Sequence, residues 1–162
     1  MSASDLLRLF AGPRYEMGSG PLQTYHCTAA DRIDCAMAST DRAALEAFHT
    51  PRYLDVLQRA ARGDMDVEGL YMGLGTPETP VFADLYDYAA LACGGTLRGA
   101  EALLAGEADV AFNPSGGYHH ARPAQASGFC YLNDVVLACQ RLAERRGRVL
   151  FLDIDVHHGD GV

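Results

Sequence analysis

The second half of the chain has the pattern of a β-α-β unit, which restricts the fold more than any other feature. Residues 109–112 and 148–156 have the character of short apolar strands, and residues 131–146 between them have helical periodicity. A helical crossover makes two such strands parallel, so the loops that follow them leave from the same edge of the sheet. We therefore predict an α/β fold with a parallel sheet flanked by helices.

The first half is predicted to be mainly helical. Polar residues at 39–41 offer N-caps for a first helix, and the helical pattern resumes at Pro51 and ends near Gly63. Residues 69–80 are rich in Gly and Pro and predict a loop. Apolar positions at helical spacing then predict a long helix over 83–106. No repeat or linker divides the chain, so we expect one continuous unit.

Length, charge and cysteine content limit the classes of function. With 162 residues, 49% of them hydrophobic, the chain forms one domain or a piece of a larger one. A net charge of −8 gives no positive field for a polyanion, so direct binding of nucleic acid is not expected. Five cysteines without a C-x-x-C pair favour a reducing compartment. The sequence lacks a signal-peptide pattern and an apolar run of ~18 residues, so we predict a cytoplasmic protein with no membrane partner.

Histidines and aspartates gather in the two loops that follow the predicted strands. Because side chains alternate along a strand, Asp153, Asp155 and His157 are expected on one face, where two neighbours can bind one metal ion. Carboxylate oxygen and imidazole nitrogen together suit zinc. The alternative for any single position is a polar cap on the next turn. For the whole set this is the weaker interpretation, because unpaired carboxylates and imidazoles at an apolar edge are costly.

The tandem histidines His119 and His120 suggest a mechanism. An imidazole with a pKa near neutrality can take a proton from water and return it to a leaving amine. A carboxylate behind each ring would fix its tautomer and raise its basicity. Asp153 and Asp160 are the carboxylates left for that purpose.

Three motifs carry a family resemblance: SGGYHHA at 115–121, SGFCYLND at 127–134 and LDIDVHHGDGV at 152–162. They resemble the zinc-dependent histone deacetylase family, which includes acetoin-utilisation proteins and acetylpolyamine amidohydrolases. Weaker similarity extends upstream to about residue 30. The resemblance implies the arginase/deacetylase fold with its central parallel sheet. It also implies hydrolysis of the acetamide on an acetylated lysine or polyamine substrate.

The resemblance also implies roles for the clustered residues. Asp155 and His157 correspond to zinc ligands, and His120 corresponds to the principal general base and acid. Backbone oxygens of Asp153, Asp155 and His157 match a structural potassium site. In the same family pattern Asp153 orients His119.

Four further residues take roles from the same resemblance. Asp160 corresponds to the carboxylate that orients the second histidine of the tandem pair. Gly128 and Phe129 would line and wall a narrow channel for the methylene stem of the substrate. Arg32 resembles the arginine at the foot of an acetate-release cavity. Glu78 is the nearest match to an aspartate that grips the substrate backbone, although its side chain is one methylene longer.

The family's third zinc ligand and its transition-state tyrosine lie downstream of Val162. We therefore expect 1–162 to be the N-terminal portion of a single catalytic domain, inactive alone and completed by the rest of that domain or by another chain. Three alternatives stay open. An arginase-like manganese hydrolase would need D-x-H-x-D on the strand, and a D-x-D phosphatase has no use for tandem histidines. A catalytically incomplete fragment or subunit that binds a partner is the third.

Overall fold

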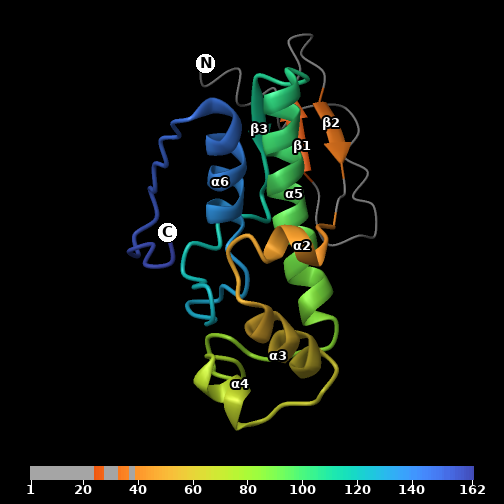
Figure 1. Ribbon diagram of the computed structural model, residues 1–162, viewed down its shortest axis with the longest axis vertical. Coiled ribbons are helices and arrows are strands. Elements are labelled where there is room, and N and C mark those ends of the chain that lie inside the picture. The colour runs from red at the N-terminus through yellow and green to blue at the C-terminus, as the bar shows by residue number, and fades with distance from the viewer. Residues whose placement is uncertain (1–23, 28–32, 37–38) are drawn as a thin grey trace.

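The computed structural model describes residues 24–27, 33–36 and 39–162. These residues form short strands early in the chain, a group of helices, a third strand and a final helix (Figure 1). In chain order the elements are β1 (Thr24–Cys27), β2 (Ile33–Ala36), α2 (Arg42–Leu45), α3 (Pro51–Ala61), α4 (Val67–Tyr71), α5 (Leu85–Ala105), β3 (Val110–Phe112) and α6 (Asp134–Arg146).

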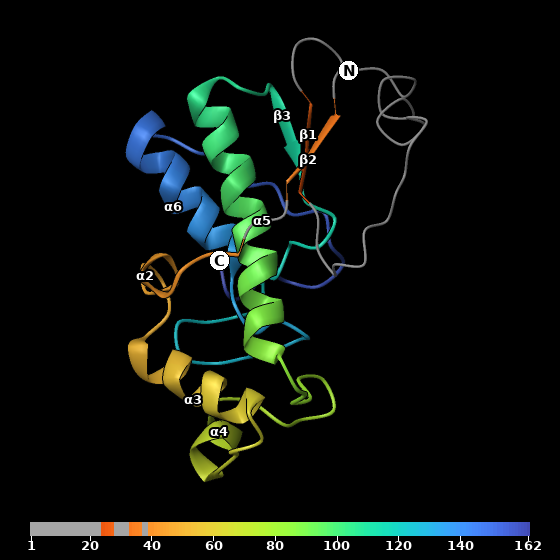
Figure 2. The ribbon, with the colours of Figure 1, turned by 90° about the vertical axis from the view of Figure 1, so that its right-hand side faces the viewer.

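Helix α5 is the central helix, and α6, α3, β1 and β3 pack against it. Figures 1 and 2 show α3 and α4 near its first turns, and α6 and the strands beside its second half. Small buried residues along α5, among them Ala89, Cys93 and Gly94, let its neighbours approach closely. The helix ends at Gly106, whose φ of 72° is the left-handed conformation that favours glycine. The long helix predicted over 83–106 is confirmed.

Local sequence explains where the other helices begin. The Thr50 side chain accepts a hydrogen bond from Tyr53 N–H, and Pro51 fills the first turn of α3, which confirms the helix predicted there. The loop predicted over 69–80 is wrong at its start, because α4 extends to Tyr71. Asp66 supplies its N-cap by accepting from Gly69 N–H at 3.0 Å. Helix α3 packs into the main core with Tyr53, Leu54 and Leu57.

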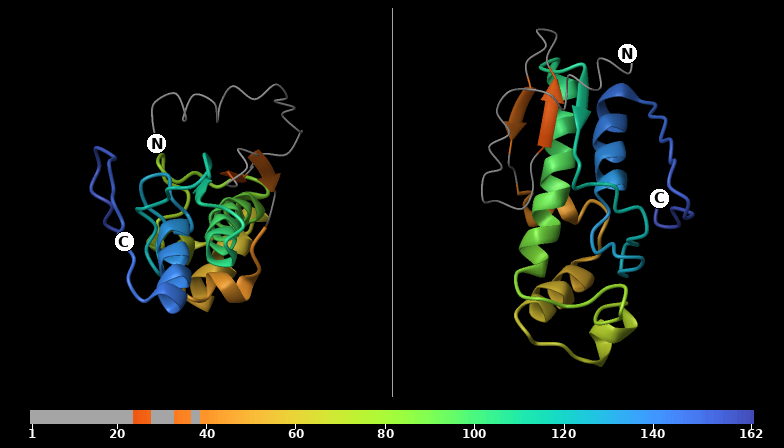
Figure 3. Two further views of the ribbon diagram at one scale, coloured as in Figure 1. Left: turned by 90° about the horizontal axis from the view of Figure 1, so that it is seen from above. Right: turned by 180° about the vertical axis from the view of Figure 1, so that it is seen from behind.

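The sheet of the described residues differs from the predicted one. It has the strand order β2-β1-β3, and both pairings are antiparallel. The strand predicted at 109–112 is confirmed as β3, but the strand predicted at 148–156 is wrong. That segment is irregular and runs along the side of α6 that faces away from α5 (Figures 1 and 3). A strand needs a neighbour to pair its backbone groups, and within 24–27, 33–36 and 39–162 no strand lies beside this segment.

The apolar side chains of the C-terminal segment face solvent. Leu150, Ile154 and Val156 are each 90% exposed, and Leu152 is 76% exposed. Helix α6 begins three residues later than predicted, because Asn133 caps it by accepting from Val136 N–H at 3.0 Å. In the described part of the chain, no helix combines the length and the apolar character needed to cross a bilayer.

Candidate active site

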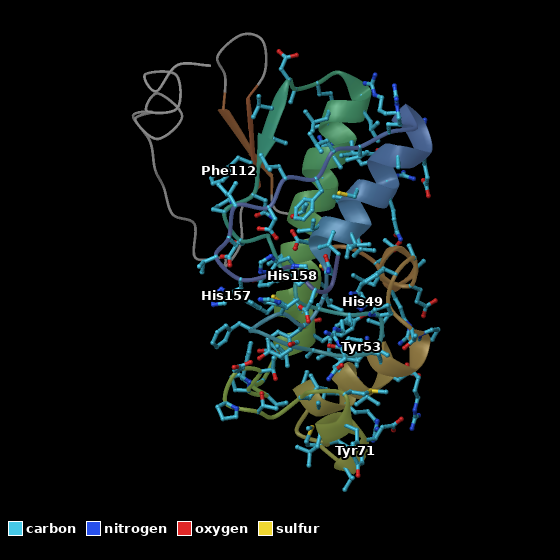
Figure 4. The ribbon with its side chains drawn as sticks, turned by 90° about the vertical axis from the view of Figure 1, so that its left-hand side faces the viewer. His49, Tyr53, Tyr71, Phe112, His157 and His158 are labelled. Carbon is cyan, nitrogen blue, oxygen red and sulfur yellow. The ribbon has the colours of Figure 1, made fainter. Side chains whose placement is uncertain are left out.

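The loop with the tandem histidines and the loop after residue 156 lie against each other. The backbone N–H of Gly161 donates to the carbonyl of His119 at 2.8 Å. Figure 4 shows His157 and His158 between Phe112 and Tyr71, with Tyr71 at the end of the molecule that α4 forms. The predicted meeting of the two loops is therefore present, although antiparallel β3 and an irregular segment replace the two parallel strands that were expected to bring it about.

His119 is paired with Asp153. Its Nδ1–H donates to Oδ2 of Asp153 at 2.6 Å, and the side chain of His119 is 10% exposed. The other oxygen of Asp153 accepts from the backbone N–H of Asp155 at 2.9 Å. These hydrogen bonds, that with His119 first, lower the pKa of Asp153 below its ordinary value. The carboxylate is therefore ionised and orients the ring so that Nε2 is its free nitrogen.

His120 is paired with Asp160, which an arginine also holds. Its Nδ1–H donates to Oδ1 of Asp160 at 2.8 Å, while Arg122 donates to Oδ2 of the same carboxylate. The hydrogen bond with His120, followed by that with Arg122, lowers the pKa of Asp160 to about 2. Sequence reasoning missed Arg122, whose only signal was a basic residue close to a predicted histidine–carboxylate pair.

The three imidazoles form a short row. The ring centroids of His119 and His120 are 4.2 Å apart, and those of His120 and His157 are 6.1 Å apart. His120 therefore lies between the buried histidine and the exposed one, whose side chain is 72% exposed. A proton carrier in this position faces both the interior of the loop and the accessible side of the site.

Asp155 and His157 contact each other at the exposed end of the row. Oδ1 of Asp155 accepts from the backbone N–H of His157 at 2.7 Å and from its Nδ1 at 2.9 Å. These hydrogen bonds, the backbone one first, lower the pKa of Asp155. Oδ2 of Asp155 and Nε2 of His157 remain available as metal ligands, and a carboxylate oxygen with an imidazole nitrogen suits zinc. Within the described ranges no group of three or more His, Cys, Asp or Glu side chains is arranged to hold a metal ion.

A hollow of about 420 Å³ separates the tandem-histidine loop from the C-terminal segment. Its lining combines glycine backbone, a histidine, both aspartates of the D-x-D sequence and apolar side chains. The residues are Gly116, Gly117, His119, Val135, Phe151, Leu152, Asp153, Ile154 and Asp155. The carboxylate–histidine pair thus faces an open space, and the C-terminal segment lines that space with both apolar side chains and carboxylates.

Gly128 lies against the ring of His120. A Cβ atom at Gly128 would be 2.4 Å from Cδ2 of His120, and the φ of 51° there also favours glycine. The next residue, Phe129, has a φ of 66° and is 68% exposed. The structure therefore places Gly128 at the tandem pair and turns Phe129 outward beside it.

Of the predicted site residues that the structure describes, Glu78 is not part of this cluster. It is exposed in the turn that Thr76 and Thr79 form through a 3.0 Å hydrogen bond. Arg32 lies outside the described residues.

Asp134 supports the tandem-histidine loop, and sequence reasoning missed it. Its carboxylate is 1% exposed and accepts from the backbone N–H of Gly117 at 3.0 Å and of Tyr118 at 2.8 Å. Thr96 of α5 donates to the same carboxylate at 2.5 Å. The signal in the sequence was an acidic residue in the first turn of a predicted helix, which ordinarily indicates a helix-end charge rather than a loop clamp.

The sequence pattern of the histone deacetylase domain matches residues 14–162. The chain belongs to the histone deacetylase family. It is 47% identical over 118 residues to histone deacetylase RPD3 of Saccharomyces cerevisiae, a match that covers 71% of this chain and 27% of that protein. It is 50% identical over 120 residues to histone deacetylase 8 of Xenopus tropicalis, covering 73% of this chain and 32% of that protein.

A third member of the histone deacetylase family, histone deacetylase B of Dictyostelium discoideum, is 47% identical over 119 residues, covering 71% of this chain and 28% of that protein. The chain thus spans about a third or less of the length of these relatives. Membership of the family implies the arginase/deacetylase fold, whose central parallel sheet is not seen in the described residues.

Proposed function

We propose that the protein carrying this chain is a zinc-dependent deacetylase that hydrolyses the acetamide of an acetylated lysine or a polyamine-like amine. The observation that supports this most directly is the pair of adjacent histidines, each with a carboxylate behind its Nδ1. Such pairs hold two imidazoles in one tautomer with both Nε2 atoms available for proton transfer. That arrangement suits amide hydrolysis, because a proton must leave water and reach the departing amine.

In this proposal Asp155 and His157 hold the zinc ion through the donor atoms they leave free. Zinc bound there supplies polarisation of the acetyl carbonyl and acidification of a water molecule. Backbone oxygens of Asp153, Asp155 and His157 hold a structural potassium ion. Neighbouring sequence, in the same chain or in another, supplies the third zinc ligand.

His120 is the principal proton carrier in the proposed reaction. Asp160 keeps the proton of the free ring on Nδ1, so Nε2 of His120 accepts the proton from water and later delivers it to the leaving nitrogen. His119, which is more buried and is held by Asp153, keeps the second ring in place and shares the positive charge that develops.

The proposal also includes residues of the protein that would contact the substrate or serve product release. Gly128 and Phe129 line the approach for the methylene stem of the substrate, and the exposure of Phe129 beside the tandem pair supports this role. Glu78 would contact the substrate backbone from its turn, and Arg32 would serve the release of acetate. We also propose a cytoplasmic location, as predicted from the sequence.

We further propose that residues 1–162 form the N-terminal portion of one catalytic domain, inactive alone and completed by the rest of that domain or by another chain. The apolar side chains at 150, 152, 154 and 156 support this, because their exposure is what a strand without its neighbours would show. In the completed domain this segment would join a parallel sheet. The same observation favours the alternative function, a subunit that binds a partner.

The test compares two variants of the full-length protein. Asp155→Asn removes a proposed zinc ligand, and His120→Ala removes only a proton carrier, so both should lose deacetylase activity on an acetyl-lysine peptide. Zinc content, measured by atomic emission, should fall in Asp155→Asn alone. Chelation should abolish activity of the unsubstituted protein and added zinc should restore it.

Asp64→Asn is the control, because Asp64 pairs with Arg59 outside the site. This variant should keep both zinc and activity. Full activity after chelation would contradict the zinc mechanism, and loss of zinc in His120→Ala would make His120 a ligand.

A further inference from the structure

Asn133 is buried between the two loops of the site, with its side-chain amide fully engaged. Its Oδ1 accepts from Val136 N–H at 3.0 Å, which caps α6. Its Nδ2 donates to the carbonyl of Ala121 at 2.9 Å and to the carbonyl of Gly161 at 3.2 Å. The side chain has one acceptor and two donor hydrogens in use, and the residue is 0% exposed.

The two carbonyls that Asn133 holds belong to the neighbours of a functional pair. Ala121 directly follows His120, and Gly161 directly follows Asp160. The amide group therefore fixes, through the backbone, the separation of the imidazole and the carboxylate that orients it. We propose that Asn133 is a positioning residue that sets the contact between His120 and Asp160; this inference rests on the proposed deacetylase function.

The close approach of the backbone at Gly161 supports the same assignment. A Cβ atom there would lie 2.4 Å from the carbonyl oxygen of Ala121 and 2.9 Å from Nδ2 of Asn133. Gly161 has no Cβ, so its loop can come close enough for the single NH₂ group of Asn133 to donate to both carbonyls. His49, labelled in Figure 4, fixes the other side of Asn133 by accepting its backbone N–H at 2.9 Å.

Asparagine is the side chain that serves both purposes in this space. Aspartate at 133 would keep the helix cap, but it would turn a second acceptor toward two carbonyl groups. Serine would also keep a capping oxygen and would lose the bidentate donor without adding charge. These two substitutions therefore separate the positioning role of Asn133 from its role as an N-cap.

The experiment is a double-mutant cycle in the full-length protein with an acetyl-lysine peptide as substrate. Asn133→Asp should lower kcat by about 10- to 100-fold, change KM less than twofold and leave the zinc content unchanged, because misplaced reacting groups slow the chemical step. Introduced into Asp160→Asn, the same substitution should lower kcat by less than about threefold, since the contact it positions is already impaired.

The control is Tyr53→Phe, which removes another buried hydrogen bond, from the Tyr53 hydroxyl to the carbonyl of Tyr131 at 2.7 Å. It should lower the melting temperature with little change in kcat in either background. If Asn133→Asp does not fold, Asn133→Ser is taken through the same cycle. Equal loss of kcat in both backgrounds, or no loss, overturns the positioning role; an unsubstituted protein that binds zinc but has no activity contradicts the proposed function instead.

Discussion

Nε2 of the buried His49 accepts a hydrogen bond from the backbone N–H of Asn133, 84 positions further along the chain. This contact joins the turn before α3 to the first turn of α6, and therefore links the helical core to the base of the candidate site. Because Nε2 accepts, the ring must be neutral with its proton on Nδ1. Burial lowers the pKa of His49 from 6.5 to about 4.

The stability of the protein is expected to depend on pH through His49. Between pH 6.5 and 4 the unfolded chain binds a proton at His49 that the folded protein does not bind, so the free energy of unfolding falls as the pH is lowered through this range. The loss is about 3 kcal/mol at most, taking ~1.4 kcal/mol for each pKa unit. Urea denaturation at pH 7, 6, 5 and 4.5 measures it. His49→Gln keeps an acceptor without a titrating ring, and an unchanged pH slope in that variant would contradict the assignment.

Gly128→Ala should disturb His120. The new methyl group would lie 2.4 Å from the imidazole at a φ of 51°, so the ring must move, and a displacement of about 1 Å costs roughly 100-fold in rate. Gly63→Ala is the matched control, since its φ is 87° but nothing lies within 4 Å. It should lose only about 1 kcal/mol of stability through backbone strain. Deacetylase kinetics that change equally in both variants would contradict the steric argument.

Arg122→Gln should raise the pKa of Asp160. Without the guanidinium the pKa of Asp160 rises from about 2 toward its ordinary value, so its carboxylate becomes protonated at a higher pH and His120 loses its partner earlier. The titration of the Asp160 carboxylate, followed by NMR from pH 2 to 5, should therefore have a higher midpoint than in the unsubstituted protein. Arg59→Gln removes a similar contact with Asp66 outside the site and should leave the Asp160 midpoint unchanged.

Residues 1–162 produced alone should self-associate. Leu150 and Ile154 are each 90% exposed, and the backbone of their segment has no sheet partner in the described ranges. Another copy of the chain can therefore contact these apolar side chains and pair with the backbone of the segment. Replacing both by Asn should shift the molecular mass measured by light scattering toward that of a monomer. Leu70→Asn, on the exposed side of α4, should have little effect. A monodisperse unsubstituted fragment would contradict the prediction.

The sequence predicted the helices well because their signals are local. The N-cap at Thr50 followed by Pro51 and the glycine after α5 are readable from neighbouring residues alone. The strand at 148–156 was wrong because a strand depends on partners, and its apolar composition says nothing about which of them are present. Helix α4 was missed because a five-residue helix has too few turns to show periodicity.

The candidate site was predictable in part. The sequence predicted that a carboxylate lies behind each of the tandem histidines. In the structure His119 contacts Asp153 and His120 contacts Asp160. Asn133 was not found, because in sequence it is only an ordinary helix cap. Its second role depends on two carbonyls from loops 12 and 28 positions away, which no local pattern reveals.

Both carboxylates that orient the tandem histidines lie in the irregular segment that follows α6. Asp153 is 34 positions from His119, and Asp160 is 40 positions from His120. During synthesis the two rings are therefore unoriented until residues 153–160 have left the ribosome. A cut between 147 and 152 would therefore break the covalent link between both histidines and both carboxylates at once, leaving each pair joined only by its hydrogen bond.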